Sequence, residues 1–262
     1  MRKEKDFLGE IEIPDEMYYG VQTTRALTNF PITGLKIYPE LIVALATVKC
    51  AAAMANMSTG RMDKKIGDAL VAAAKEVMEG KLHDQFVTDV IQGGAGTSIN
   101  MNTNEVLTNR ALEIIGEKRG NYSIISPNDH ANMAQSTNDA FPSAVHVALV
   151  DLGEKLIEEL ELLHDAFMVK AKEFHTIIKM GRTHLQDAIP ITLGQEFATY
   201  AKVAARGAAR IKYSLDKMHY LNMGGTAVGT GLNAEAEYVV NVVKAISELT
   251  GKPYYNAPDL ID

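Results

Sequence analysis

Apolar residues recur every three to four positions in the middle of the chain, which is the spacing of one face of an α-helix. The longest such pattern runs over residues 140–173, where seven apolar residues share one face: Val145, Leu149, Leu152, Leu156, Leu160, Leu163 and Phe167. At about 1.5 Å per residue, these roughly 34 residues would span about 50 Å, a length typical of helical bundles. Pro142 falls in the first turn of this predicted helix, where its missing N–H does no harm.

Further helices are predicted over residues 39–57, 63–79, 99–115, 192–221 and 234–249. Gly80 and Gly116 fit helix C-terminal caps, and Thr192 with Gln195 has the spacing of a capping box. Residues 1–38 contain spaced prolines and glycines and are predicted to be irregular, apart from a short extended piece near residues 10–13. The polar stretches 117–135 and 181–187 are predicted to be loops.

These elements predict a mainly α protein with two parts. Residues 1–138 would form a mostly helical N-terminal domain, and residues 139–262 the first long helices of a helical bundle. Two long helices and one shorter one leave apolar faces uncovered, so we expect either more chain or a partner chain to cover them.

Composition narrows the class of protein. The chain has 262 residues, 47% hydrophobic and 23% charged, which is typical of globular domains, and a net charge of −7 that disfavours nucleic acid and anionic lipid as partners. The single cysteine, Cys50, excludes an intrachain disulfide and lies in an apolar helical run, so we expect it in the core. We find no run of about 18 apolar residues and no signal-like start, and therefore expect a cytoplasmic protein without a membrane span.

Three polar clusters interrupt the helical pattern, over residues 92–104, 127–139 and 181–187. The first two end where helices are predicted to begin, and a helix N-terminus offers unpaired N–H groups and a partial positive charge. Brought together, their hydroxyl and amide groups would form a cradle for a small dicarboxylate. The alternative is that Ser, Thr, Asn and Asp serve there as ordinary helix caps.

Other candidate residues are ambiguous on sequence alone. His184 could take part in proton transfer or donate to a carboxylate, or it could simply be an exposed loop residue, and the same holds for His130. The glycine-rich stretch 224–231 follows no strand, so we interpret it as a connector rather than a dinucleotide-binding loop. No zinc-type, EF-hand or P-loop spacing occurs, and we expect no metal site.

At these clusters the chain resembles the aspartase/class II fumarase superfamily. The resemblance covers nearly the whole chain and rests on motifs that occur in the same order: residues 4–9, 18–23, 29–32, 92–102, 126–130, 135–139, 181–187 and 224–233. Fumarases typically read Gly-Ser-Gly-Thr-Gln-Thr, Gln-Ser-Ser-Asn-Asp and Tyr-Trp-Gly. This chain has Ala95 and Ser98 in the first motif, Thr137 in the second and Tyr19 in the third, which favours the aspartase branch over the fumarase branch.

The resemblance implies reversible conversion of L-aspartate to fumarate and ammonia without an organic cofactor, and leaves activation by a divalent cation open. It implies that Thr97, Ser136 and Thr137 hold the side-chain carboxylate of the substrate. Asn138 and His184 would meet the amino group, with His184 as the candidate catalytic residue, and Thr183 would meet the other carboxylate.

One family feature does not occur in this chain. Family members carry a Gly-Ser-Ser-x-Met-Pro-x-Lys-x-Asn loop whose serine acts as the base, and they are longer, with a five-helix bundle, a C-terminal domain and tetramers that share sites between subunits. We therefore expect the fold to be incomplete and the isolated chain to be inactive. A non-catalytic helical oligomerisation module is the alternative from another class.

Overall fold

The computed structural model describes residues 1–262 and is mainly helical, as predicted. The chain forms two compact units. The first unit comprises residues Met1–Ala148 and His219–Asp262, and the second comprises Leu149–Met218. The predicted domains, 1–138 and 139–262, do not coincide with these units, because the last helix of the chain packs against a helix near its start.

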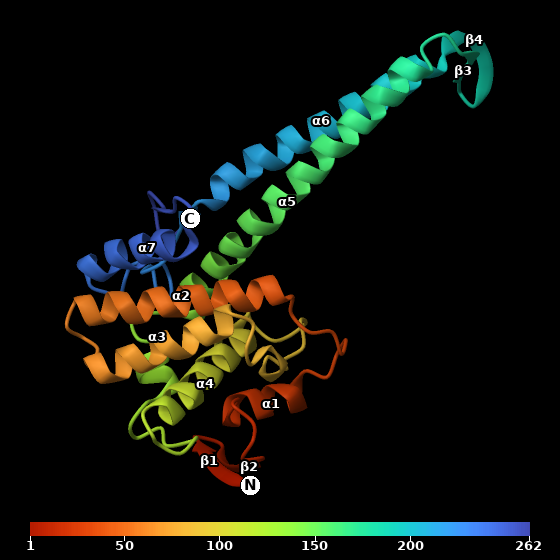
Figure 1. The fold of residues 1–262 in the computed structure, drawn as a ribbon. Coiled ribbons are helices and arrows are strands. Elements are labelled where there is room, and N and C mark those ends of the chain that lie inside the picture. Colours follow the sequence, from red (N-terminus) through yellow and green to blue (C-terminus); the bar gives the residue numbers. More distant parts are fainter. The chain divides into compact units, whose positions relative to one another are not determined.

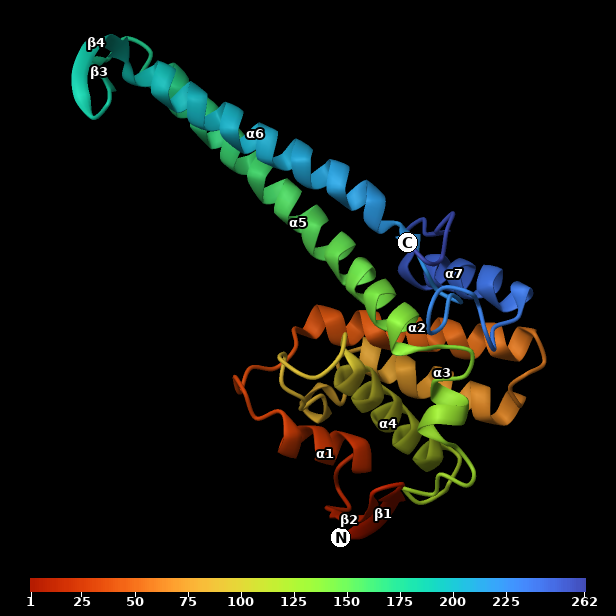
Figure 2. The same ribbon diagram turned by 180° about the vertical axis from the view of Figure 1, so that it is seen from behind.

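Four helices form the core of the first unit: α2 (Pro39–Ser58), α3 (Lys64–Met78), α4 (Thr97–Ile114) and α7 (Ala236–Thr250). Helix α2 packs against both α3 and α7, and α3 packs against α4 (Figures 1 and 2). By length and mean hydropathy (20 residues, 1.6) α2 could cross a membrane, but 72% of its most apolar window is buried within the protein. Its apolar composition is therefore accounted for by core packing, and Cys50 on this helix is buried as predicted.

Several predicted helix ends are confirmed by their caps. The Asp63 carboxylate accepts hydrogen bonds from the N–H groups of Lys65 (2.9 Å) and Ile66 (3.3 Å) and so caps the start of α3. Gly80 and Gly116 follow the ends of α3 and α4 with φ of +93° and +85°, the left-handed region that favours glycine.

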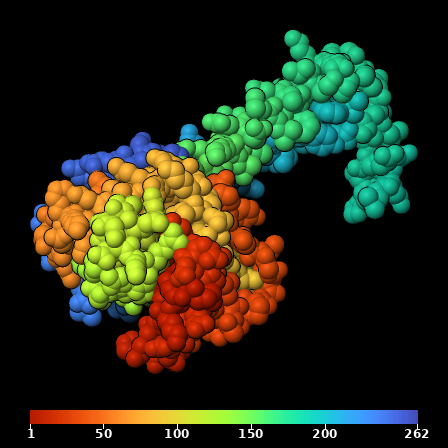
Figure 3. Space-filling model, turned by 60° about the horizontal axis from the view of Figure 1, so that its bottom comes forward, coloured from red at the N-terminus to blue at the C-terminus, as the bar shows by residue number.

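The N-terminal 38 residues are more ordered than predicted. Strands β1 (Arg2–Asp6) and β2 (Gly9–Ile13) form an antiparallel hairpin on the surface of the first unit (red in Figure 3), and helix α1 (Val21–Asn29) follows. The prediction of irregular structure is therefore wrong for 21–29. The reason is that α1 is stabilised by residues distant in sequence, which local pattern does not reveal.

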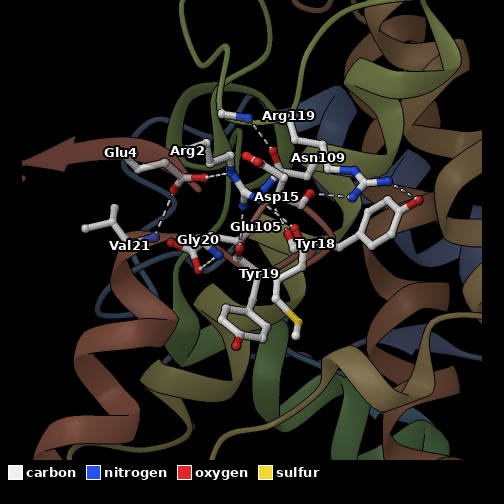
Figure 4. Close-up of polar contacts among 12 residues, drawn as sticks. Arg2, Glu4, Asp15, Tyr18, Tyr19, Gly20, Val21, Glu105, Asn109 and Arg119 are labelled. Carbon is white, nitrogen blue, oxygen red and sulfur yellow. Dashed lines mark hydrogen bonds and ion pairs between the residues drawn. The ribbon is translucent and has the colours of Figure 1, made fainter. Parts of the chain in front are cut away.

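Two buried carboxylates hold the start of α1 (Figure 4). Glu105 accepts hydrogen bonds from the N–H groups of Gly20 (2.8 Å), Gln22 (2.8 Å) and Thr23 (3.1 Å), and Glu4 accepts one from Val21 (2.9 Å). These are the four N–H groups that a helix start leaves without a backbone partner. Burial raises the pKa of Glu105 to about 7, against the lowering effect of its donors.

The second unit contains most of α5 (Thr137–Glu173), which begins in the first unit, together with the antiparallel α6 (Leu193–Met218). Thr192 and Gln195 form the predicted capping box, with Thr192 N–H to Gln195 Oε1 at 2.9 Å and Gln195 N–H to Thr192 Oγ1 at 3.1 Å. Many large apolar side chains are exposed on the two helices of this unit, including Leu149, Leu152, Leu156, Leu162, Leu163, Val169, Val203 and Tyr213.

A β-hairpin joins α5 to α6 where a loop was predicted. Strands β3 (Ile178–Thr183) and β4 (Gln186–Thr192) pair antiparallel and project beyond the ends of the two helices (Figures 1 and 2). Helix α6 also ends at Met218, before the predicted end at residue 221, because β5 (Tyr220–Leu221) pairs with β6 (Tyr255–Asn256).

Pro142 lies inside α5 rather than in its first turn, because the helix begins at Thr137 and not at residue 140. A proline there cannot donate to the carbonyl of Asn138, four residues earlier. That carbonyl instead accepts a hydrogen bond from the Asn222 side-chain amide at 3.2 Å. The Asn222 side chain thus replaces the missing backbone donor, and α5 continues through Pro142.

Candidate active site

A cleft of about 720 Å³ in the first unit lies beside the start of α5. It is lined by the turn that precedes α5, by Ser136 and Thr137, and by the glycine-rich segment that contains Thr226. Parts of the second predicted polar cluster and of the glycine-rich segment therefore meet around one cavity.

Ser136 caps α5 and keeps a proton to donate. Its Oγ accepts a hydrogen bond from the N–H of Asn138 at 3.2 Å, while its own N–H donates to Asp139 Oδ1 at 2.8 Å. This reciprocal pattern is a capping box with aspartate in the third position. Because the Ser136 hydroxyl accepts locally, its O–H remains available to a ligand in the cleft. The residue therefore serves as a cap, and the same geometry permits anion binding.

Thr137 connects the starts of α4 and α5. Its Oγ1 accepts a hydrogen bond from the side-chain amide of Asn100 on α4 at 3.3 Å, which again leaves its O–H available. The ring of Phe141 lies against Gly96, the residue before α4, so closely that a side chain at Gly96 would collide with it. The two helix starts are thus side by side, which brings parts of the first two polar clusters together. Thr97, the first residue of α4, is exposed and is not among the residues that line the cleft.

Asp139 ties the glycine-rich segment to the start of α5. Its Oδ2 accepts from the N–H groups of Gly224 (3.1 Å) and Thr226 (3.0 Å), and the side chain is fully buried. Burial raises the pKa of Asp139, and the backbone donors oppose that shift. Thr226 has φ of +59°, which is rare for a β-branched residue. The stretch predicted as a connector is therefore also a wall of the cleft.

Asn138 is oriented by the same segment. Its side-chain Nδ2 donates to the carbonyl of Ala227 at 2.7 Å. Because a backbone carbonyl only accepts, this bond fixes which end of the amide faces Ala227 and leaves Oδ1 as the end that can accept.

Lys49 on α2 lies behind the cleft and was not singled out from the sequence. It is buried, and its Nζ donates to Asn132 Oδ1 at 2.9 Å and to Gln135 Oε1 at 2.8 Å. Burial lowers the pKa of Lys49 to about 7, although Asp139 opposes that shift. A lysine within a strongly apolar helical run was the available signal, because such a residue needs buried acceptors.

Thr183 and His184 belong to the second unit, at the tip of the β3–β4 hairpin. His184 and Leu185 form its two-residue turn with φ of +48° and +62°, and both are exposed. Positive φ at both central residues is the pattern of a type I′ turn, the turn that suits a twisted hairpin. The structure thus groups Thr97, Ser136, Thr137 and Asn138 in one unit and Thr183 with His184 in the other.

His130 has a structural role. It lies in the π-helical turn η2 (Pro127–Ala131), and its Nδ1 accepts a hydrogen bond from the Ser126 N–H at 2.9 Å. A ring nitrogen that accepts carries no proton, and partial burial lowers the pKa of His130. The cleft itself is lined mainly by hydroxyl and amide groups, and nowhere do three His, Cys, Asp or Glu side chains gather as metal ligands would.

Comparisons with known proteins identify relatives that match the whole chain. The chain is 58% identical to aspartate ammonia-lyase of Bacillus subtilis (strain 168) over 261 residues and 46% identical to that of Escherichia coli (strain K12) over 265 residues. It covers 55% of each of these relatives, and they cover 100% of it, so the chain spans about half their length.

Solved structures of related proteins share the fold. A fumarate lyase:delta crystallin from Brucella melitensis, bound to cobalt, matches 99% of this chain with a TM-score of 0.94 and 45% identity, over 57% of its own length. A class II fumarase from Schistosoma mansoni matches 97% with a TM-score of 0.89 and 36% identity, over 58% of its length. With residues 9–262 matching the lyase family profile as well, the chain belongs to that lyase family, within the aspartase/class II fumarase superfamily.

Proposed function

We propose that the chain contributes the carboxylate-binding cleft of an aspartate ammonia-lyase, which converts L-aspartate reversibly to fumarate and ammonia. Identities of 46–58% to aspartate ammonia-lyases over the whole chain support this reaction. The observation that carries the proposal is the cleft beside the start of α5, where the hydroxyl groups of Ser136 and Thr137 accept local hydrogen bonds and keep their protons for a ligand.

The reaction needs such donors because negative charge builds up on the substrate. A base removes a proton from the carbon next to the side-chain carboxylate, and the electron pair moves into that carboxylate to form an aci-carboxylate dianion. The dianion returns the electron pair to form the carbon–carbon double bond while the carbon–nitrogen bond breaks and ammonia leaves. Donors fixed before the reaction stabilise this extra charge without reorganisation.

The residue roles follow from which groups can donate and accept. Thr97, Ser136 and Thr137 would donate to the side-chain carboxylate, and Asn138 Oδ1 would accept from the substrate ammonium group. His184 would also meet the amino group and Thr183 the second carboxylate. Since these two residues lie on the exposed hairpin of the second unit, their roles rest on the family resemblance.

We further propose that the complete site requires other chains. The exposed apolar face of α5 and α6 in the second unit supports association with further helices, in a homotetramer of the family type. The Gly-Ser-Ser-x-Met-Pro-x-Lys-x-Asn sequence does not occur among these 262 residues, so the chain by itself would not release fumarate. A cytoplasmic location and the absence of an organic cofactor remain predictions, and activation by a divalent cation stays open.

Class II fumarase is the second candidate, because a fumarase of 36% identity shares the fold. The two reactions differ in the group that leaves, ammonia or water. Thr137, where fumarases typically carry serine, and the higher identity to aspartate ammonia-lyases favour the former.

The test is fumarate release followed by ultraviolet absorbance, with L-aspartate and L-malate in parallel. The chain is assayed alone and co-expressed with the part of an aspartate ammonia-lyase relative that it does not cover. We expect no activity alone, aspartate activity in the complex, and a fall of roughly 10²-fold in kcat/KM for Ser136→Ala or Thr137→Val. Ser123→Ala, an exposed serine, is the control. A complex that prefers L-malate, or that is unaffected by Ser136→Ala, would contradict the proposal.

A further inference from the structure

The residues that line the cleft carry no net charge to balance a dicarboxylate. A dicarboxylate brings two negative charges, yet apart from Arg61 and Asp129, which carry opposite charges, the polar groups that line the cleft are neutral. Neutral donors next to a low-dielectric interior gain much of their strength from fixed charges behind them. Lys49 is such a charge, because both of its hydrogen-bond acceptors, Asn132 and Gln135, line the cleft.

Lys49 also fixes the orientation of these two amide side chains. An ammonium group only donates, so the amide oxygens must face it and the amide nitrogens must point elsewhere. Asn132 Nδ2 donates to the carbonyl of Gln135 at 3.2 Å, and Gln135 Nε2 donates to the carbonyls of Ala131 (3.2 Å) and Met133 (3.1 Å). Each bond is possible because Lys49 holds the oxygen end of the amide.

These bonds close the turn that leads directly into Ser136. Within it Ala134 has φ of +58°, a conformation that a non-glycine residue keeps only where its surroundings impose it. The oxygen of Asn132 accepts from Asn100 and Asn104 on α4 as well, at 3.2 Å each, so the same atom links α2, the turn and α4. The placement of Ser136 and Thr137 against α4 therefore depends on a network organised around Lys49.

We propose that Lys49 is the positioning residue of the dicarboxylate cleft: it holds the turn before α5 in place through Asn132 and Gln135, and it supplies the buried positive charge that favours a dianion. The inference rests on the proposed carboxylate site and deepens it. Lys49 would not touch the ligand but would act through the two amides. Burial lowers the pKa of Lys49 to about 7, so an anion placed in the cleft would stabilise its protonated form.

Asp139 is the opposing buried charge near the cleft, and it is held by three backbone N–H groups. With Lys49 present, the two charges offset each other. Without Lys49, the carboxylate would remain without a counter-charge close to the ligand. Loss of the lysine charge should therefore weaken dianion binding more than monoanion binding.

The experiment compares two unreactive ligands, succinate and its monoamide succinamate, by calorimetric titration of the complex that the chain forms with the part of an aspartate ammonia-lyase relative that it does not cover. We expect the wild-type complex to prefer succinate, and Lys49→Met to weaken succinate roughly tenfold, the effect of a modest change in a buried charge interaction, with a smaller effect on succinamate. Lys244→Met, which removes the same charge from the exposed surface of α7, should change neither affinity. Equal weakening of both ligands by Lys49→Met, or no change, would overturn the inference.

Lys49→Arg covers the case in which the methionine variant does not fold. Arginine keeps the charge but not the compact ammonium geometry, so both affinities should fall while the preference for succinate survives. Loss of that preference in Lys49→Arg would overturn the inference. If Ser136→Ala abolishes succinate binding while Lys49 variants keep it, the proposed function stands and this inference fails. If the wild-type complex binds neither ligand, the proposed function fails, and the inference fails with it because it rests on that function.

Discussion

The start of α1 and the starts of α4 and α5 present the same physical problem and solve it in different ways. At α1 the protein supplies its own anions, since Glu4 and Glu105 accept from all four unpaired N–H groups. At α4 and α5 the side-chain caps are Gln92, Ser136 and the carboxylate Asp139, and the hydroxyls of Ser136 and Thr137 still have protons to donate. We call the first the closed N-terminus and the second pair the open N-termini.

The comparison teaches how to separate structural from ligand-binding helix ends. A closed N-terminus satisfies its donors within the protein, so a ligand could only displace a buried carboxylate. An open N-terminus retains donors beside a cavity, and the nearest buried cation, Lys49, stands behind it. What distinguishes the two is whether carboxylates take up every free donor or hydroxyl groups keep donors beside a cavity, whereas the presence of capping residues alone does not.

The largest effect should come from removing the main anion of the closed N-terminus. Glu105→Ala leaves three N–H groups and the Thr23 hydroxyl without their buried acceptor. We expect a loss of about 3–5 kcal/mol in the free energy of unfolding, the usual cost when one partner of a buried charged interaction is removed and the other partner stays buried. Urea denaturation followed by circular dichroism measures it, with the exposed Glu10→Ala as control. Similar midpoints for the two variants would contradict the closed assignment.

Adding one methyl group to the closed N-terminus should have the next largest effect. A Cβ on Gly20 would lie 2.5 Å from Tyr122 Oη and 2.6 Å from Glu4 Oε2, so Gly20→Ala should destabilise by about 3 kcal/mol, the upper part of the range for overpacking. Gly207→Ala is the matched control, because its nearest neighbour lies at 3.9 Å and alanine favours the helix. Thermal unfolding of both variants checks this, and a stable Gly20→Ala would mean that the contact is looser than described.

Lys49, the cation behind the open N-termini, should make the free energy of unfolding depend on pH. The folded pKa of Lys49, about 7, lies below the ordinary value of 10.5, so between these values the unfolded chain binds more protons. The free energy of unfolding should therefore rise by about 2 kcal/mol between pH 7 and 9. Below pH 7 the contribution of Lys49 to it should not change with pH. Urea midpoints across this range for the wild type and Lys49→Met test the sign. An identical slope in the two proteins would show that Lys49 does not titrate there.

The smallest effect should come from the strained wall of the cleft. Thr226→Gly keeps the N–H that donates to Asp139 and removes a side chain held at positive φ, so we expect a gain of up to about 1 kcal/mol in stability. Leu221→Gly, at a fully buried position with ordinary φ, is the contrasting control and should destabilise. A destabilised Thr226→Gly would show that the threonine side chain contributes more than its backbone strain.

The sequence predicted those parts of the fold whose causes are local. Helix α5 follows from apolar periodicity and α2 from a continuous apolar run, and the caps at Asp63 and at Thr192 with Gln195 follow from short spacings. Helix α1 was missed because its stabilising acceptor, Glu105, is more than eighty residues away. The β3–β4 hairpin was missed because its turn uses His184 and Leu185 and not the Asn-Gly or Asp-Gly pair that marks such a turn in a sequence.

The candidate site shows the same division. The clusters of Ser136, Thr137 and Thr97 were recognisable from their spacing and family resemblance, and two of the three clusters meet in the first unit. Asp139 had a visible signal, its position three residues after Ser136, but its bonds to Gly224 and Thr226 join segments 85 and 87 residues apart. The role of Lys49 depends on the side chains of Asn132 and Gln135, and such long-range pairings are set by the packing of α2 against the turn.

Pro142 shows how one residue can make a distant part of the chain necessary. Because proline has no backbone N–H, the carbonyl of Asn138 lacks its helical donor and accepts a hydrogen bond from the Asn222 side chain. Pro142→Ala would let the helix bond to itself, and Asn222 would then compete with the backbone for the same oxygen. A local helical hydrogen bond, which could form before the rest of the chain folds, is thus replaced by one that forms only when Asn222 reaches Asn138. Formation of the Asn222–Asn138 hydrogen bond would therefore show when residues 219–226 have docked during folding.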